Sequence, residues 1–408
     1  MIALGPIFSS LKKNSLGALL IALQIAVTLA ILANSLHIIE ARVNTLAEPT
    51  GLIEDNLFSF DLQTAVPLEA QPAEREADLS KLRALPGVSS AYATNALPLG
   101  WSGWSMGLRL SKESDSREAS SAIYFADQHT IATLGTSLLS GRNFSAQDLT
   151  NRGPQDLSWP SSIIVTESLA TRLFDTQDAV GKSVYIGDVD SPGASPSTIV
   201  GVIKDVRSPW RGWNDGWLSQ VLLAPQNLLG SGRFMVRTQA GQMAAAMGAV
   251  QETMLSVNPE RVVTEPKSFA QTRASFYRND TAMVAMLVAV IAALALVTAF
   301  GIFGMVSFWV TQRRKQIGTR RALGATKTDI LLHFMAENFL IVSIGILLGW
   351  ALAIGLNIWL SRSFEMERLG FGWIMIGSLG VYLVGQLATL YPAREAASVA
   401  PVVATRGA

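Results

Sequence analysis

The chain has 408 residues, of which 49% are hydrophobic and 15% are charged, and its formal net charge is +1. This near-neutral balance lacks the strong positive charge of a nucleic-acid-binding protein, so no nucleic acid partner is expected. The sequence contains no cysteine, which excludes disulfide bonds and thiolate chemistry.

Four long apolar stretches predict membrane-spanning helices. Each holds about 20 residues or more without a charged side chain, the length that a helix needs to cross ~30 Å of hydrocarbon. They cover residues 16–38, 281–310, 338–360 and 371–391. Backbone amides in lipid must bond within their own helix, so separate spans predict a helical bundle. The first apolar run is longer than the core of a secretory signal, and we interpret it as an uncleaved anchor.

Basic residues predict the orientation of these spans. They precede the first span at Lys12 and Lys13, lie between the second and third spans in residues 311–329, and follow the fourth at Arg394. By the positive-inside rule these segments and both termini face the cytoplasm. Residues 45–280 are then outside, with 19 Lys and Arg against 25 Asp and Glu, while the rest of the chain holds 13 against 6. An acidic outer part and a basic inner part therefore cancel in the net charge.

The outer domain contains two copies of a strand–helix–strand pattern, in residues 55–95 and 230–267. Alternating apolar residues predict the strands, and apolar residues at helical spacing, such as Met243 and Met247, predict the helix between them. Two βαβ-like units of this kind usually share one sheet backed by helices. The intervening residues 96–229 then form an inserted lobe.

The expected fold is therefore an α-helical membrane bundle of four transmembrane helices plus an α+β outer domain, made of two βαβ units and an inserted lobe. Residues 1–44 hold the N-terminal segment and the first span, residues 45–280 the outer domain, and residues 281–408 a module with the remaining spans.

Tryptophans gather in the inserted lobe. Exposed aromatic side chains mark surfaces for partners or ligands, and large aromatic residues also fill cores, so both interpretations stay open. The candidates for a partner or substrate surface are Trp101, Trp104, Trp210, Trp213 and Trp217.

Two spacing patterns predict helix packing. Phe269, Phe276 and Met283 recur every seven residues, which predicts that the second span extends outward as a stalk that pairs with a neighbour. Small residues allow close contact between membrane helices, either within one subunit or across a dimer. These residues are Gly345, Gly349, Gly377 and Gly380.

The loop in residues 311–329 has more structure than orientation alone requires. Residues 316–323 can form about two helical turns, Gly324 suits a left-handed C-terminal cap, and Thr326 with Asp329 predicts a capping box for the next helix. Two short helices joined by a glycine make a rigid knob, which is what force transmission to a partner requires. The charges could also serve only to orient the spans.

The sequence predicts no catalytic residue, bound cofactor or metal. A Walker A loop needs G-x-x-x-x-G-K-[ST], and the only Gly-Lys-Ser, at residues 181–183, has Thr176 where the first glycine should be. The three histidines lack metal-ligand spacing. We therefore expect no enzyme activity in this chain and an energy source in a separate subunit.

Several motifs in order carry a resemblance to a known family. Residues 124–148 contain YF, LG, L-x-G-R-x-F and D, residues 163–174 read IIVTESLATRLF, residues 199–207 read IVGVIKDVR, and residues 316–340 read QIGTRRALGATKTDILLHFMAENFL. Together they resemble the permeases of the macrolide-exporter MacB type, which end in an FtsX-like permease module. The similarity extends from the first span to Pro401.

The resemblance implies a bacterial inner-membrane permease that dimerises, with itself or with a related permease, and sits on a cytoplasmic ATPase. ATP and Mg²⁺ would be used by that ATPase, and its motion would pass to the periplasmic domain by mechanotransmission. A periplasmic adaptor and an outer-membrane channel are further partners that the resemblance suggests. The implied ATPase-coupling residues are Arg313, Arg314, Ile317, Gly318, Arg320, Arg321, Leu323 and Gly324.

Two alternatives stay open at this point: an FtsX-like regulator of a periplasmic hydrolase, and a lipoprotein-releasing permease. FtsX-like regulators usually have a smaller outer domain, which favours efflux.

The chain also departs from the family at Gln312 and Gln316, where acidic residues are usual. A carboxylate contact to the ATPase would be neutral at these positions.

Overall fold

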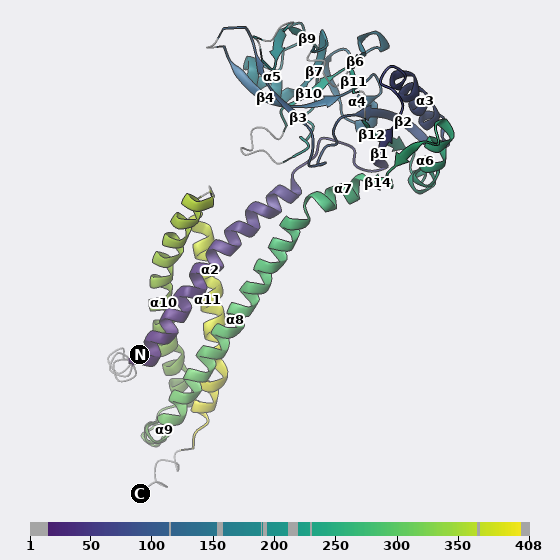
Figure 1. The fold of residues 1–408 in the computed structure, drawn as a ribbon. Coiled ribbons are helices and arrows are strands. Elements are labelled where there is room, and N and C mark those ends of the chain that lie inside the picture. Colours follow the sequence, from purple (N-terminus) through teal and green to yellow (C-terminus); the bar gives the residue numbers. More distant parts are fainter. Residues whose placement is uncertain are drawn as a thin grey trace. The chain divides into compact units, whose positions relative to one another are not determined.

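The computed structural model describes residues 15–113, 116–152, 158–188, 190, 194–210, 219–228, 231–364 and 368–400. The chain divides into a helical unit, made of Met1–Ala47 and Asn279–Ala408, and an α+β unit, made of Glu48–Arg278. Figure 1 traces both units along the sequence.

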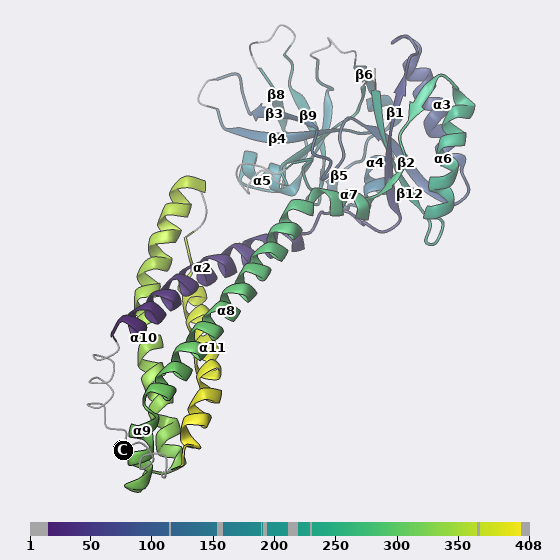
Figure 2. The same cartoon turned by 60° about the horizontal axis from the view of Figure 1, so that its bottom comes forward.

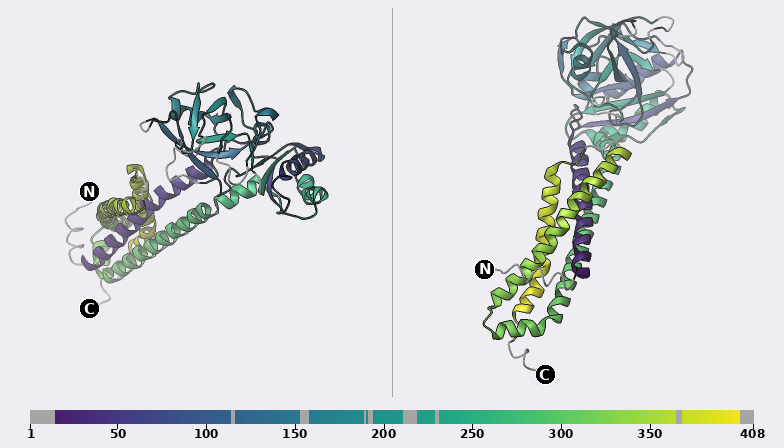
Figure 3. Two further views of the ribbon diagram at one scale, coloured as in Figure 1. Left: turned by 45° about the horizontal axis from the view of Figure 1, so that its top comes forward. Right: turned by 90° about the vertical axis from the view of Figure 1, so that its left-hand side faces the viewer.

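The helical unit contains the predicted membrane spans. Its helices are α2 (Ser15–Ala47), α8 (Arg278–Gln312), α9 (Arg314–Ala322), α10 (Lys327–Phe364) and α11 (Phe371–Ala397). All except α9 are long and apolar enough to cross a membrane, and these four run alongside one another (Figure 3). The prediction of a four-helix membrane bundle is confirmed.

Glycines bring α10 close to α2. A Cβ added to Gly345 would lie 2.6 Å from Ile25 Cγ2, and one added to Gly349 would lie 2.9 Å from Leu29 Cδ2. On α11, a Cβ at Gly377 would lie 3.0 Å from Leu29 Cδ1, whereas one at Gly380 would meet no described atom within 4 Å. Three of the four predicted packing glycines are therefore used within one subunit.

The α+β unit is built around a sheet that we call sheet A. Its strands are β1 (Leu57–Thr64), β2 (Val88–Thr94), β12 (Ser231–Thr238), β13 (Arg261–Val263) and the short β14 (Lys267–Ser268). They run antiparallel in the order β13-β1-β12-β2, with β14 also paired to β1. Each strand–helix–strand unit contributes two strands that flank a strand of the other unit, which is the split βαβ arrangement of ferredoxin-like folds.

Helices α3 (Gln71–Ala84) and α6 (Met243–Val257) cover one face of sheet A (Figure 2). Alternate strand residues point toward them, and Phe60 of β1 stacks on its register partner Phe234 of β12 with ring centroids 5.2 Å apart. Leu82 and Val250 pack against these rings from the helices. The two-residue alternation of each strand thus separates this apolar face from a second face that carries Tyr92 and charged residues.

The inserted lobe forms a closed barrel. Its elements are β3 (Trp104–Arg109), β4 (Glu118–Phe125), α4 (Thr130–Leu134), β5 (Leu138–Gly141), η1 (Ala146–Asp148), β6 (Thr150–Arg152), β7 (Ser162–Thr166), α5 (Glu167–Phe174), β8 (Ser183–Ile186), β9 (Ser197–Ile203), β10 (Val221–Ala224) and β11 (Gln226–Leu228). The strand order is β5-β9-β7-β10-β4-β3-β8, and β8 also pairs with β9, which closes the ring. One apolar cluster with members from every ring strand, including Ile123, Val165 and Leu222, fills its interior.

The predicted continuous stalk is wrong at its outer end. Helix α7 (Phe269–Phe276) stops at Tyr277, and α8 begins at Arg278 as a separate helix. Phe269 and Phe276 are 3% and 2% exposed, and the Phe276 ring lies 4.6 Å from that of Trp101. The seven-residue spacing of these aromatic residues therefore reflects burial in the core of the α+β unit rather than pairing between stalks.

Candidate functional site

The coupling segment, residues 311–329, forms a bent connection between two long helices. Helix α8 ends at Gln312, Arg313 leaves the helical conformation with φ −102° and ψ 11°, and α9 follows. Gly324 then has a φ of +98°, a left-handed value that favours glycine. The capping box is present, because the Thr326 amide donates to Asp329 Oδ2 at 2.9 Å and the Asp329 amide donates to Thr326 Oγ1 at 3.1 Å. The predicted helix–glycine–capped helix arrangement is confirmed.

An apolar contact attaches α9 to the bundle. Ile317 is 4% exposed and belongs to a cluster that includes Trp309 of α8 and Phe334 of α10. Gly318 is buried beside it. All four long helices contribute to this cluster, so Ile317 joins α9 to the hydrophobic core of the bundle.

A buried ion pair strengthens the same attachment. Arg313 Nη1 donates to both carboxylate oxygens of Glu337, at 2.9 and 3.1 Å, and the guanidinium lies 5.7 Å from the Trp309 ring centroid. The Glu337 side chain is only 2% exposed. Glu337 directly precedes the predicted span of residues 338–360, but its partner was not predicted from the sequence. Its position next to an apolar run could have predicted a cationic partner, because an acidic residue in a membrane helix usually pairs with a residue of opposite charge.

The opposite side of α9 is exposed. Leu323 is 84% exposed at the end of α9, and Arg314, Arg320 and Gly324 are also exposed. Arg321 is half-buried and donates from Nη1 to the Ala325 carbonyl at 3.0 Å. The predicted coupling residues therefore separate into two groups. The buried or half-buried group is Arg313, Ile317, Gly318 and Arg321, and the exposed group is Arg314, Arg320, Leu323 and Gly324.

The tryptophans occupy different environments. Trp101 is 55% exposed and lines an open pocket of about 380 Å³, together with Arg233 and Lys267. Trp104 packs edge-on against Phe125 at 5.4 Å in the barrel core.

Trp210 is half-buried against a second core cluster of the α+β unit. Trp213 and Trp217 lie outside the described residues. Of the three candidate tryptophans that the structure describes, Trp101 alone is mainly exposed, whereas Trp104 and Trp210 contribute to packing.

Ionisable residues in the part of the chain that the structure describes form ion pairs rather than a metal site. No group of three or more His, Asp or Glu residues among them could hold a metal ion. The most buried example in the α+β unit is Arg261, which donates to Asp78 and to Glu74, each at 2.5 Å. Burial raises the pKa of Asp78, and the hydrogen bond from Arg261 opposes that rise. These residues fasten α3 to β13 and have the geometry of a structural network.

Comparisons with known proteins identify the family of the chain. The model described as MacB-like periplasmic core domain matches residues 17–253, and the model described as FtsX-like permease C-terminal matches residues 288–401. Similar curated proteins include two named macrolide export ATP-binding/permease protein MacB. The one from Bdellovibrio bacteriovorus is 29% identical over 256 residues, covering 60% of this chain and 38% of that protein. The one from Pasteurella multocida is 26% identical over 304 residues, covering 71% and 43%.

The chain thus spans about two fifths of the length of these relatives. Solved structures similar to it include the periplasmic region of MacB from Actinobacillus actinomycetemcomitans, at 14% identity and a TM-score of 0.33 over 54% of this chain and 94% of that chain. The extracellular domain of the noncanonic ABC-type transporter YknZ from Gram-positive bacteria matches at 18% identity and a TM-score of 0.32, over 50% and 99%. Because the periplasmic core model covers more than half of the chain and the FtsX-like model follows it, the chain belongs to the MacB-type family of FtsX-like permeases.

Proposed function

We propose that this chain is the permease subunit of an ABC export complex in a bacterial inner membrane. A cytoplasmic ATPase docks on the coupling segment, and its ATP-driven motion passes through the membrane helices to the α+β unit in the periplasm. The observation that carries the proposal is the two-sided build of α9: Ile317 and Arg313 anchor it to the bundle, and Leu323 projects from it at 84% exposure.

The anchoring side supports force transmission. An element that transmits displacement must be stiffer than the partner interface that drives it, and α9 is held by both an apolar cluster and a buried charge pair. The capping box between Thr326 and Asp329 stabilises the first turn of α10 directly behind the glycine turn. A push on α9 is therefore delivered to α8 and α10 together.

The exposed side supports docking. Protein interfaces commonly have an apolar centre with a polar rim, and the exposed Leu323, Arg314 and Arg320 of this segment provide both kinds of group. The partner should present an apolar pocket lined by acidic or polar groups. Gln312 and Gln316 are also exposed, so they offer this partner neutral hydrogen-bonding groups in place of the usual carboxylates.

The ATPase would bind ATP and Mg²⁺, and this chain would bind neither. The two family models that match the chain describe permease and periplasmic parts, whereas the name of the curated relatives also includes ATP binding. The basic coupling segment supports a cytoplasmic location for α9 and for both termini. A permease dimer, formed with a second copy or a related chain, and a periplasmic adaptor with an outer-membrane channel complete the proposed assembly. The match to a MacB-like periplasmic core favours export over a role in regulating a hydrolase.

Site-directed cross-linking tests the docking surface. Because the chain has no native cysteine, each adduct must form at the introduced one. Leu323→Cys should cross-link in cells to a protein that contains a Walker A loop, identified by mass spectrometry. Leu347→Cys is the matched control, because Leu347 is an exposed apolar residue within the membrane span of α10 and should give no such adduct. Failure to capture an ATP-binding protein at residue 323, or equal capture at 347, would refute the docking surface.

A further inference from the structure

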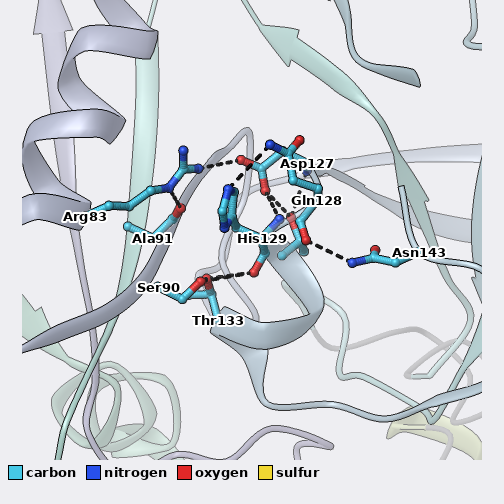
Figure 4. Close-up of polar contacts among 9 residues, drawn as sticks. Arg83, Ser90, Ala91, Asp127, Gln128, His129, Thr133 and Asn143 are labelled. Carbon is cyan, nitrogen blue, oxygen red and sulfur yellow. Dashed lines mark hydrogen bonds and ion pairs between the residues drawn. The ribbon is translucent and has the colours of Figure 1, made fainter. Parts of the chain in front are cut away.

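Helix α4 of the inserted lobe packs on the face of sheet A that α3 and α6 leave open. It contacts β2 and β12, and its last residue, Leu134, is fully buried. Beneath it, Tyr92 of β2 and Met235 of β12 are fully buried on the same face of the sheet. The Ser90 and Thr133 hydroxyls join the two elements at 2.7 Å. Figure 4 shows this contact from the side of the polar residues.

An arginine from the first βαβ unit holds the amino end of α4. Arg83 of α3 donates from Nε to the Ala91 carbonyl of β2, at 3.0 Å, and from Nη2 to Asp127 Oδ2, at 2.9 Å (Figure 4). Asp127 lies three residues before the first residue of α4, and its other oxygen accepts from the amide of His129, the N-cap of α4, at 2.8 Å. Burial raises the pKa of the Asp127 carboxyl, and the positive charge of Arg83 opposes that rise. One guanidinium thus joins the edge strand of sheet A to the start of α4.

An arginine from the second βαβ unit holds the carboxyl end of α4. Arg237 of β12 donates from Nε to the Thr133 carbonyl at 2.7 Å and from Nη2 to the Leu134 carbonyl at 3.2 Å. Its guanidinium also donates to the carbonyls of Ile53 and Asp55, at 2.6 and 3.1 Å. A cation is favoured beside the free carbonyls at the end of a helix.

The two arginines act on one short helix from opposite ends. Arg83 on α3 and Arg237 on β12 come from different βαβ units, so α4 cannot move away from one unit without also breaking contacts to the other. Helix α4 lies between β4 and β5 of the lobe, so its position also determines where the lobe sits on the sheet.

We infer that Arg83 and Arg237 form a clamp on α4 that makes sheet A and the inserted lobe a single rigid body. The lobe then does not hinge on sheet A when the permease works. Movement within the periplasmic region must take place outside this contact. The inference concerns the α+β unit alone and does not depend on the docking of an ATPase.

Spin-label distances in the full chain test this inference. Labels on Arg172→Cys of α5 and Gln251→Cys of α6, both exposed, report the separation of the lobe from the sheet. We expect one narrow distance distribution with the native clamp. Replacing both clamp residues, as Arg83→Met with Arg237→Met, should broaden the distribution or add a second population. Hydrogen exchange of the α4 amides should accelerate by about tenfold or more.

Arg142→Met is the matched control. Arg142 forms an ion pair with Asp148 at 2.8 and 2.9 Å, but both residues belong to the lobe, so its loss should leave the distances and the exchange of α4 unchanged. A broad distribution with the native clamp, or an unchanged narrow one in the double variant, would overturn the inference. If the double variant does not fold, the test uses the milder Arg83→Lys and Arg237→Lys variants, and the hydrogen-exchange rates of their α4 amides are compared with those of the native chain. Faster exchange confined to α4 supports the clamp, and unchanged exchange contradicts it.

Discussion

Arg313 and Glu337 are 24 residues apart in sequence, yet one guanidinium nitrogen binds both oxygens of a carboxylate that is almost fully buried. The pair joins the end of α8 to α10 at the point where the coupling segment begins. Since both residues belong to the helical unit, the contact defines how the coupling segment is held within that unit.

Breaking this pair from one side should be costly. Glu337→Leu leaves the buried Arg313 charge without its carboxylate, and single removal of a buried partner typically costs about 3–5 kcal/mol. We expect a clear fall in the melting temperature of the detergent-purified chain. Replacing both residues, as Arg313→Met with Glu337→Leu, should recover much of the loss, because no charge is then stranded.

An exposed ion pair provides the comparison. Arg109 and Glu118 are 3.2 Å apart on neighbouring strands, with side chains 33% and 53% exposed, so Arg109→Met should cost about 1 kcal/mol or less. If Glu337→Leu destabilises the chain no more than Arg109→Met does, the buried pair does not hold the segment.

The glycines of α10 and α11 should differ in their tolerance of larger residues. Gly345→Leu must push against Ile25, because even an added Cβ would lie 2.6 Å away, and overpacking typically costs about 1–3 kcal/mol. Gly380→Leu has open space and should leave the melting temperature almost unchanged. Equal destabilisation by the two substitutions would mean that Gly380 also faces a packed surface.

Acid should weaken the lobe through Asp148. Arg142 donates to both oxygens of this carboxylate, and the two hydrogen bonds hold the pKa of Asp148 well below its ordinary value. A carboxyl with a lowered folded-state pKa contributes stability above its unfolded pKa of about 3.9, and that contribution disappears as the pH falls further.

Melting temperatures measured from pH 6 to pH 3 check this sign. The native chain should lose more stability below about pH 4 than Asp148→Asn does, because the variant has no proton to take up at that position. Parallel curves for the two proteins would show that Asp148 does not contribute to acid sensitivity.

How much of this could be predicted from the sequence depends on how local each interaction is. The spans follow from uninterrupted apolar runs, and the Thr326–Asp329 box follows from residues three positions apart, so both could be predicted. The partner of Arg313 could not be predicted from the sequence, because the contact with Glu337 depends on how two helices pack.

The regular spacing of apolar or small residues predicts that they are buried, but it does not identify what they pack against. The spacing of Phe269 and Phe276 records that both face an apolar environment, but the environment is the core of the α+β unit. Likewise, Gly345 and Gly349 predict a close helix neighbour without naming α2. The ring closure of the barrel by β8 and β9 depends on pairing that no local pattern encodes.

The most direct test of the account separates the anchored side of α9 from its exposed side. We would measure the affinity of the cognate ATPase, once captured by cross-linking, for the chain in lipid nanodiscs. Leu323→Asp should leave the melting temperature unchanged, because Leu323 is 84% exposed, and should weaken ATPase binding by about tenfold or more, since it places a charge in an apolar pocket. Ile317→Ala should instead lower the melting temperature, because it opens a cavity worth about 2–5 kcal/mol. Unchanged ATPase affinity in a folded Leu323→Asp variant would contradict the proposed docking of the ATPase on this segment.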